Sequence, residues 1–184
     1  MLGYLAILER WNRVYNLTAV DDPETMVHRH LLDSLAAVPL LCGHTFVDVG
    51  SGAGLPGIPL AIWLRDRRFV LLDSSARKTR FLTQVKIELQ LDNVEVVHSR
   101  VEAWIPPGQF DGVMSRAFAS LPDFVRLAGH LASSQGTLYA FKGIWPEPEP
   151  AELPTPYAVT VCNALAVPGA AAHRHLVEVR RMDT

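Results

Sequence analysis

Residues 46–60 read FVDVGSGAGLPGIPL, and this stretch decides the fold of the chain. A short apolar, β-branched run leads into the acid Asp48, and glycines then follow at every second position. Prolines at the start of the next apolar run suit the first turn of a helix, where a missing N–H has no intrahelical partner. The order therefore predicts a buried strand, a tight loop and the start of a helix.

The loop glycines predict a cofactor site. Dinucleotide-binding loops space their glycines as G-x-G-x-x-G, whereas this loop has Gly50, Gly52 and Gly54. Asp48 would repel a pyrophosphate, but it can accept hydrogen bonds from a cationic amine, directly or through water. A second predicted strand ends in Asp73, which can bind both hydroxyls of a ribose. The two acids favour S-adenosylmethionine over NAD, and the alternative is an empty Rossmann-like turn kept for packing.

Length and composition indicate one globular domain over residues 1–184. The chain is 49% hydrophobic and 20% charged, which excludes a disordered protein. We expect a helical N-terminal extension over residues 1–43 and an α/β core over 44–184. Cys42 and Cys162 are expected to be reduced core residues of a cytoplasmic protein, with no metal site. The sequence also predicts no signal peptide and no membrane span.

The charge pattern is mixed. A formal net charge of −2 is a mild argument against a nucleic-acid-binding protein. Basic residues are clustered at 65–68, 77–80 and 180–181, however, and local patches can attract phosphate without a basic average. For any one cluster, the alternative is a solvated helix end.

The rest of the chain alternates between two patterns of apolar residues. Helical spacing dominates residues 1–40, with a second helix predicted from Pro23 to about Leu35. Strands and helices then alternate, which predicts a mostly parallel sheet with helices on both faces and an antiparallel finish. The predicted strands are 45–49, 69–73, 94–97, 110–115, 137–142, 157–165 and 175–179, and the helices 57–66, 76–91 and 121–131.

Polar residues at the carboxyl ends of these strands are the candidate site residues, because open parallel sheets bind ligands there. Glu102 follows the third strand, on the side expected for adenine, and its alternative role is that of an acid at a helix N-terminus. Arg116 follows the fourth strand, where the methyl acceptor would approach, or else forms a surface ion pair. Lys142 ends a strand that should be buried, which favours a ligand-facing role.

Several motifs, in the same order along the chain, resemble the glucose-inhibited division protein B family of bacterial small-subunit ribosomal RNA guanine-N7 methyltransferases. The resemblance runs from about residue 10 to residue 180, and the family usually carries a further helix before it. It implies a class I S-adenosylmethionine-dependent methyltransferase fold. It also implies cofactor contacts at Gly50, Leu55, Val101, Glu102 and Arg116. The motifs lie at residues 11–18, 30–35, 48–60, 72–74, 99–102, 115–121, 141–143 and 174–176.

The resemblance implies methyl transfer to N7 of a guanine in 16S ribosomal RNA, free or in the 30S subunit. Nothing in the sequence indicates more than a monomer, so we expect a monomer. N7 already carries a lone pair, so we expect no general base and assign Arg116 and Lys142 to substrate positioning. Lys78, Arg174 and His175 are the predicted RNA contacts. Two alternatives remain at this stage, namely a methyltransferase acting on a small molecule or protein, and a non-catalytic RNA-binding module.

Overall fold

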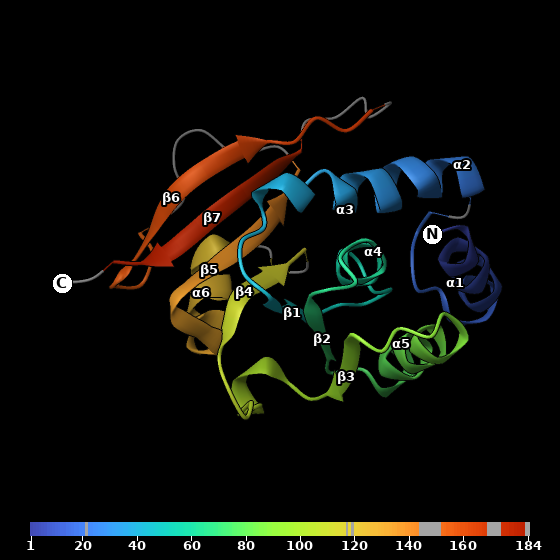
Figure 1. The fold of residues 1–184 in the computed structure, drawn as a ribbon, viewed down its shortest axis with the longest axis horizontal. Helices are drawn as coiled ribbons and strands as arrows, with labels where there is room; N and C mark the ends of the chain where they lie inside the picture. The colour runs from blue at the N-terminus through green and yellow to red at the C-terminus, as the bar shows by residue number, and fades with distance from the viewer. Residues whose placement is uncertain (21, 117, 119, 144–151, 169–173, 183–184) are drawn as a thin grey trace.

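The structure is a computed structural model, and it describes all residues except 21, 117, 119, 144–151, 169–173 and 183–184. The described residues form a seven-stranded sheet in the order β3-β2-β1-β4-β5-β7-β6 (Figure 1). Neighbouring strands from β1 to β5 pair in parallel, whereas β7 is antiparallel to β5 and β6. The parallel sheet and its antiparallel finish were both predicted from the sequence. The strands are β1 Thr45–Val49, β2 Arg68–Asp73, β3 Val94–His98, β4 Phe110–Ser115, β5 Ala132–Lys142, β6 Tyr157–Ala164 and β7 His175–Arg181.

Helices occupy the segments before and between the strands. The second N-terminal helix departs from expectation, because a π-helix interrupts it between two short α-helical pieces. The predicted helices 57–66 and 76–91 end earlier than their apolar pattern indicates. The helices are α1 Leu2–Tyr15, α2 Pro23–Met26, the π-helix η1 Val27–Leu32, α3 Asp33–Leu35, α4 Gly57–Trp63, α5 Ala76–Glu88 and α6 Leu121–Ala128; the 3-10 turns are η2 Val38–Leu40, η3 Val101–Ala103 and η4 Gly129–Leu131.

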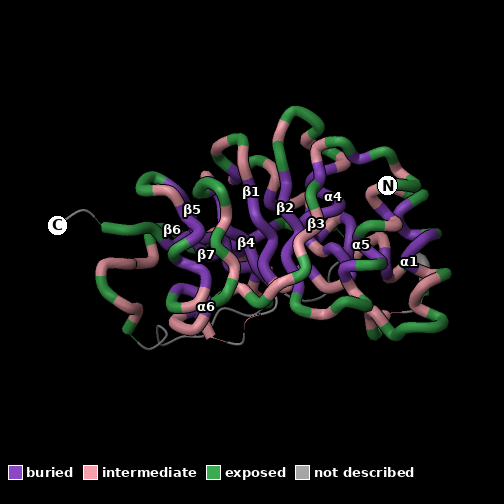
Figure 2. The backbone as a smooth tube through the Cα atoms, turned by 90° about the horizontal axis from the view of Figure 1, so that it is seen from below, coloured by how far each residue is buried: buried purple, intermediate pink, exposed green. Residues whose placement is uncertain are grey.

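The sheet buries a separate apolar core on each face, because alternate residues of a strand point to opposite sides. Phe46 packs with the core formed by α1, α4 and α5, whereas its neighbour Val47 packs with the core under α6. Figure 2 shows the central strands buried along most of their length. Helices cover both faces, as predicted, and the carboxyl ends of the parallel strands are left for polar residues.

The N-terminal helix α1 packs against the glycine loop. Tyr4 is fully buried, and its hydroxyl donates a 2.6 Å hydrogen bond to the carbonyl oxygen of Ala53. The last turn of α1 is different, because Val14 is 70% exposed there. The extension therefore supports the loop through its first two turns.

Two further findings concern expectations from composition. Cys42 and Cys162 are both exposed free thiols, so the prediction that they are core residues was wrong. Cys42 follows the last turn before β1, and Cys162 lies on the edge strand β6, where residues 160–162 are all exposed. In the described part of the chain, every helix is too short or too polar to cross a bilayer. The same residues contain no cluster of three or more potential metal ligands.

Candidate active site

The site begins where the strand order reverses, between β1 and β4. Connections from β1 lead to one side and those from β4 to the other, so a crevice opens above their carboxyl ends. The hydroxyl of Ser115, at the end of β4, donates a 2.7 Å hydrogen bond to the carbonyl oxygen of Val49 at the end of β1. The two strands are therefore fixed to each other at the floor of the crevice.

The glycine loop needs its glycines for different reasons. Gly50, Gly52 and Gly54 have φ values of +71°, +58° and +85°. Residues that carry a Cβ atom rarely adopt these values. A Cβ on Gly54 would lie 2.5 Å from the side chain of Ile58, so this glycine allows α4 to pack closely. A Cβ on Gly52 would meet only the carbonyl oxygen of Gly50, at 3.8 Å, so Gly52 faces open space where a ligand could approach.

Asp48 lies below this loop and is 1% exposed. Its Oδ2 accepts a 3.0 Å hydrogen bond from the backbone N–H of Gly57, and its buried Oδ1 has no partner among the described residues. Burial raises the pKa of Asp48 to about 7, although the Gly57 hydrogen bond and the charge of Arg116 act in the opposite direction. A buried oxygen without a donor is a strong acceptor for an incoming cation.

Gly57 explains how Asp48 is held. A Cβ at this position would lie 2.3 Å from the side chain of Leu71 and 2.8 Å from Oδ2 of Asp48. Only glycine brings the first turn of α4 close enough to donate its N–H to that carboxylate. Gly57 was recognisable as part of the loop motif, but its contact with Asp48 was not predicted.

Asp73 ends β2 on the other side of the loop and is 5% exposed. Its Oδ2 accepts from the backbone N–H of Gly52 at 2.9 Å, and its Oδ1 accepts from the N–H of Ser75 at 2.8 Å. Lys78 lies 3.8 Å from Oδ2. The carboxylate is thus fixed in orientation and turned toward a cavity of about 280 Å³ at the ends of β1, β2 and β3.

This cofactor-side cavity brings together several predicted site residues. Gly50, Asp73, Val101 and Glu102 line it, and so does Lys78, which was predicted to contact RNA. Ser74, Ser99, Arg100 and Phe118 complete much of its wall. Of these, Phe118 was not predicted, because an apolar residue after a strand carries no signal of its own.

The other predicted cofactor residues lie around this cavity without lining it. Asp48 lies below the glycine loop, Gly52 lies within the loop, and Gly54 packs against α4, as described above. Leu55 is partly buried against the apolar core. Arg116 lines a second cavity, of about 300 Å³, together with Lys142, Arg174 and His175. The structure therefore separates the predicted site into two neighbouring cavities.

The second cavity is cationic, and Lys142 connects it to the first. The Lys142 ammonium donates a 2.8 Å hydrogen bond to the carbonyl oxygen of Phe118, which lines the cofactor-side cavity. Partial burial lowers the pKa of Lys142. His175 Nδ1 lies 2.8 Å from the carbonyl oxygen of Gly143. Asp33 also lines this cavity. It belongs to the family motif at residues 30–35, but it was not among the predicted site residues.

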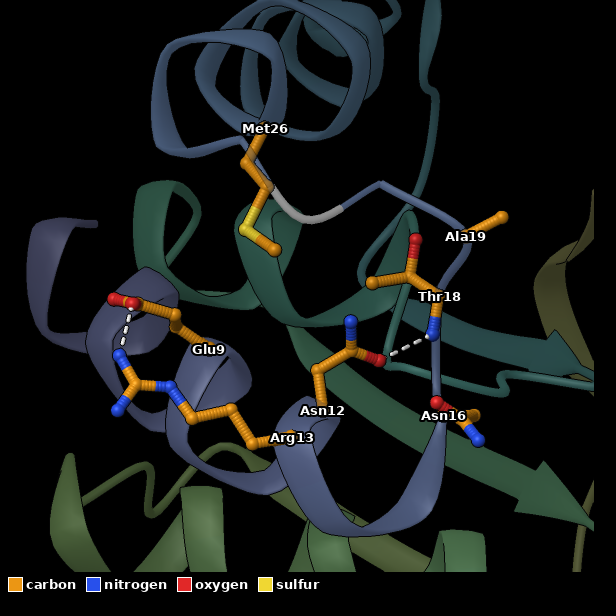
Figure 3. A pocket seen from close by; sticks show the side chains of 7 residues that line it. All are labelled: Glu9, Asn12, Arg13, Asn16, Thr18, Ala19 and Met26. Atoms are coloured by element: carbon orange, nitrogen blue, oxygen red, sulfur yellow. Dashed lines mark hydrogen bonds and ion pairs between the residues drawn. The ribbon is translucent and has the colours of Figure 1, made fainter.

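A third cavity, of about 510 Å³, lies at the end of α1 (Figure 3). Asn12 Oδ1 accepts a 2.8 Å hydrogen bond from the N–H of Thr18, and Glu9 forms an ion pair with Arg13 at 2.6 Å. Both pairs are drawn in Figure 3. None of the predicted cofactor residues lines this cavity, and its carboxylate is already paired within the helix. Its chemistry therefore does not fit a cationic cofactor.

The sheet order, the glycine loop and the acids near the carboxyl ends of β1 and β2 define the class of S-adenosylmethionine-dependent methyltransferases. Solved structures agree on the fold. A methyltransferase from Aquifex aeolicus superposes with a TM-score of 0.66 at 16% identity, covering 89% of this chain and 96% of the other. A methyltransferase from Geobacter sulfurreducens, solved with S-adenosyl-L-homocysteine, gives a TM-score of 0.58 at 15% identity and covers 98% of both chains.

The sequence comparisons are more specific. The chain belongs to the GidB family, described as rRNA small subunit methyltransferase G, whose model matches residues 1–177. Ribosomal RNA small subunit methyltransferase G of Pseudomonas aeruginosa strain LESB58 is 55% identical over 98% of this chain and 85% of its own length. The protein of the same name from Stutzerimonas stutzeri is 52% identical with the same coverage.

Proposed function

We propose that this chain transfers the methyl group of S-adenosylmethionine to N7 of a guanine in 16S ribosomal RNA. Membership of the GidB family supports the reaction class, and relatives at 55% identity carry the name of a small-subunit ribosomal RNA methyltransferase. The observation that carries the proposal is the pair of buried acids, Asp48 and Asp73, on either side of the glycine loop.

The residues present fit the cofactor. Asp48 Oδ1 would accept from the amine of the methionine part, Asp73 would bind the ribose hydroxyls, and Val101 and Glu102 would flank the adenine. Gly50 and Gly52 leave room for the chain that joins these parts. When bound, the cofactor supplies a methyl group on a sulfonium, with a good leaving group.

The protein itself positions the guanine. N7 attacks as a free lone pair, so no side chain has to remove a proton. Placing two reactants in line can supply several kcal/mol of the barrier reduction. Methylation makes the guanine cationic, so cations close to N7 would hinder it. We therefore assign Arg116 and Lys142 to O6 or phosphate, and Lys78, Arg174 and His175 to further RNA contacts.

We also propose that the whole chain works as one methyltransferase domain, as a monomer in the cytoplasm, on RNA presented by the 30S subunit. Two apolar cores that share one sheet support a single folding unit. Light scattering of the purified protein checks the oligomeric state. A stable dimer would contradict this part of the proposal and leave the reaction untouched.

The reaction itself is tested with purified protein, radiolabelled S-adenosylmethionine and 30S subunits from a strain that lacks the corresponding gene. We expect label in 16S RNA and a new 7-methylguanosine at one position. Absence of label would overturn the proposal. Raising the salt concentration discriminates a small-molecule enzyme, because only an RNA enzyme should lose substrate affinity steeply. A non-catalytic module would show no calorimetric binding of S-adenosylmethionine.

A further inference from the structure

Asp33 is a buried carboxylate that joins two arginines from distant parts of the chain. Its side chain is 6% exposed. Its Oδ2 lies 3.2 Å from Nη2 of Arg116, which follows β4, and its Oδ1 lies 3.1 Å from Nε of Arg174, which precedes β7. Each carboxylate oxygen therefore has its own guanidinium, and one acid fixes the orientation of both.

The π-helix η1 supplies the support for Asp33. π-Helical turns are rare and are found frequently at functional sites. In η1, His30 is 5% exposed, and its Nε2 lies 3.0 Å from the hydroxyl of Thr18. Ser34, fully buried beside Asp33, donates a 2.6 Å hydrogen bond from its hydroxyl to the carbonyl oxygen of His30. Contacts on both sides therefore hold the helix end that carries the carboxylate.

Arg116 keeps donors for a further partner. A guanidinium carries five N–H donors, and the contact with Asp33 takes only part of that set. Arg116 Nη1 is buried and has no acceptor among the described residues. The side chains of Arg116 and Arg174 are 29% and 24% exposed, and both line the second cavity together with Lys142. Arg116, Lys142 and Arg174 carry three positive charges and Asp33 carries one negative charge, so the described residues give this cavity a net charge of +2.

We propose that Asp33 is a positioning residue for the substrate, which orients the guanidinium groups of Arg116 and Arg174 toward one phosphate of the target RNA. The inference rests on the proposed function. Arginine binds phosphate through a planar, directional fork, so its affinity depends on orientation as well as on charge. A fixed pair of forks also loses less conformational entropy on binding than two mobile side chains do.

The direction in which one substitution changes the affinity for RNA separates positioning from simple charge attraction. Asp33→Asn removes a negative charge from the cavity while keeping its shape. If charge alone governed RNA binding, the variant would bind the polyanion more tightly. If Asp33 positions the arginines, the variant binds more weakly, although the cavity has become more positive.

Glu178 provides a matched control. It is 7% exposed, like Asp33 it pairs with an arginine, and it lies on β7 outside the second cavity. The experiment compares D33N and E178Q for kcat, for KM with 30S subunits and for the affinity of S-adenosylmethionine. We expect D33N to raise KM for 30S subunits at least about tenfold, which corresponds to about 1.4 kcal/mol. Cofactor affinity should stay unchanged in both variants, and KM should stay unchanged in E178Q.

A double-mutant cycle sharpens the test. If Asp33 acts through Arg174, D33N should cost much less 30S affinity in an R174Q background than in the wild type. Equal costs in the two backgrounds would overturn the inference. A D33N variant with wild-type or tighter 30S binding, or one that also loses the cofactor, would overturn it too.

A second variant and a comparison with wild-type activity make the result interpretable. If D33N does not fold, Asp33→Glu keeps the charge but displaces the carboxylate by one methylene group. Positioning predicts the same loss of 30S affinity in D33E, and wild-type affinity in D33E would contradict it. A wild-type protein that methylates no 16S RNA overturns the proposed function and this inference together. An active wild type with unaffected D33N and D33E overturns this inference alone.

Discussion

Two buried carboxylates lie below the crevice, and their surroundings differ. Asp48 and Asp33 are 1% and 4% exposed, but Asp33 has two guanidinium partners, whereas Asp48 has a single backbone N–H. Burial without a counter-charge in contact raises the pKa of Asp48 to about 7. The comparison teaches that burial alone does not define a role. Each oxygen of Asp33 already has a guanidinium partner, whereas Oδ1 of Asp48 has none among the described residues and is assigned to the cofactor amine in our proposal.

Asp48→Asn tests the carboxylate that has an unpaired oxygen, and it should have the largest effect on the affinity for S-adenosylmethionine. The amide keeps an oxygen for the N–H of Gly57 but removes the charge that would bind the cofactor amine. Hydrogen bonds to charged groups contribute about 1.5–3 kcal/mol, so calorimetry should show roughly a 10- to 100-fold loss of S-adenosylmethionine affinity. The melting temperature should not fall, because an uncompensated buried charge has been removed.

The exposed Asp66 gives the control for charge alone, and D66N should leave both quantities unchanged. If D48N kept full cofactor affinity, the role of Asp48 as the amine acceptor would be wrong.

Gly57→Ala tests the contact that holds Asp48 in place. The new Cβ would meet Leu71 and Asp48 at distances shorter than van der Waals contact. Overpacking of this kind costs about 1–3 kcal/mol, which lowers the melting temperature by roughly 2–12 °C in a chain of this size. Gly108 is the matched control, because nothing lies within 4 Å of its Cβ position. Equal melting temperatures for G57A and G108A would contradict the packing described here.

The pH dependence of cofactor binding sharpens the contrast further. A raised pKa means that Asp48 becomes protonated as the pH falls through about 7, and the neutral acid no longer attracts an ammonium group. Affinity should therefore fall below pH 7, by at most about tenfold per pH unit. Titration calorimetry between pH 5.5 and 8.5 measures this profile. The profile should be flat over this range in D48N, and an equally steep profile in the variant would rule out Asp48 as its source.

Lys78→Ala should have the smallest effect. Lys78 is 39% exposed and lies 3.8 Å from Asp73, so solvent screens this ion pair. The ion pairs of Asp33 with Arg116 and Arg174, called the Asp33 network below, are more deeply buried. Exposed pairs contribute about 0–1 kcal/mol, so cofactor affinity should change less than about fivefold. Lys86, on the same helix but outside the cofactor-side cavity, is the control. A larger loss in K78A than fivefold would place Lys78 among the main cofactor contacts.

Much of the fold was predictable because the strands are short, apolar and separated by turn residues. The glycine loop and both flanking acids were found from residue types and spacing alone. The start of β5 was predicted at Thr137 but lies at Ala132, because the polar residues 133–135 continue the strand without an apolar signal. Cys42 and Cys162 were misplaced because residue type predicts burial only on average.

The second cavity was less predictable. Arg116, Lys142, Arg174 and His175 were identified individually, from strand ends and from the family resemblance. Asp33 could not be identified as their partner, because a regular α-helix was expected where the π-helix η1 occurs, and helical spacing does not encode such a turn. Contacts between residues 33, 116 and 174 depend on tertiary structure and leave no local pattern.

The Asp33 network joins three side chains that are synthesised at different times during translation. Its three side chains stand at positions 33, 116 and 174, in segments that the chain brings together only through the sheet. Translation delivers the glycine loop and six strands before it delivers Arg174. The cationic cavity is thus completed only after the strands β1 to β6 have been synthesised.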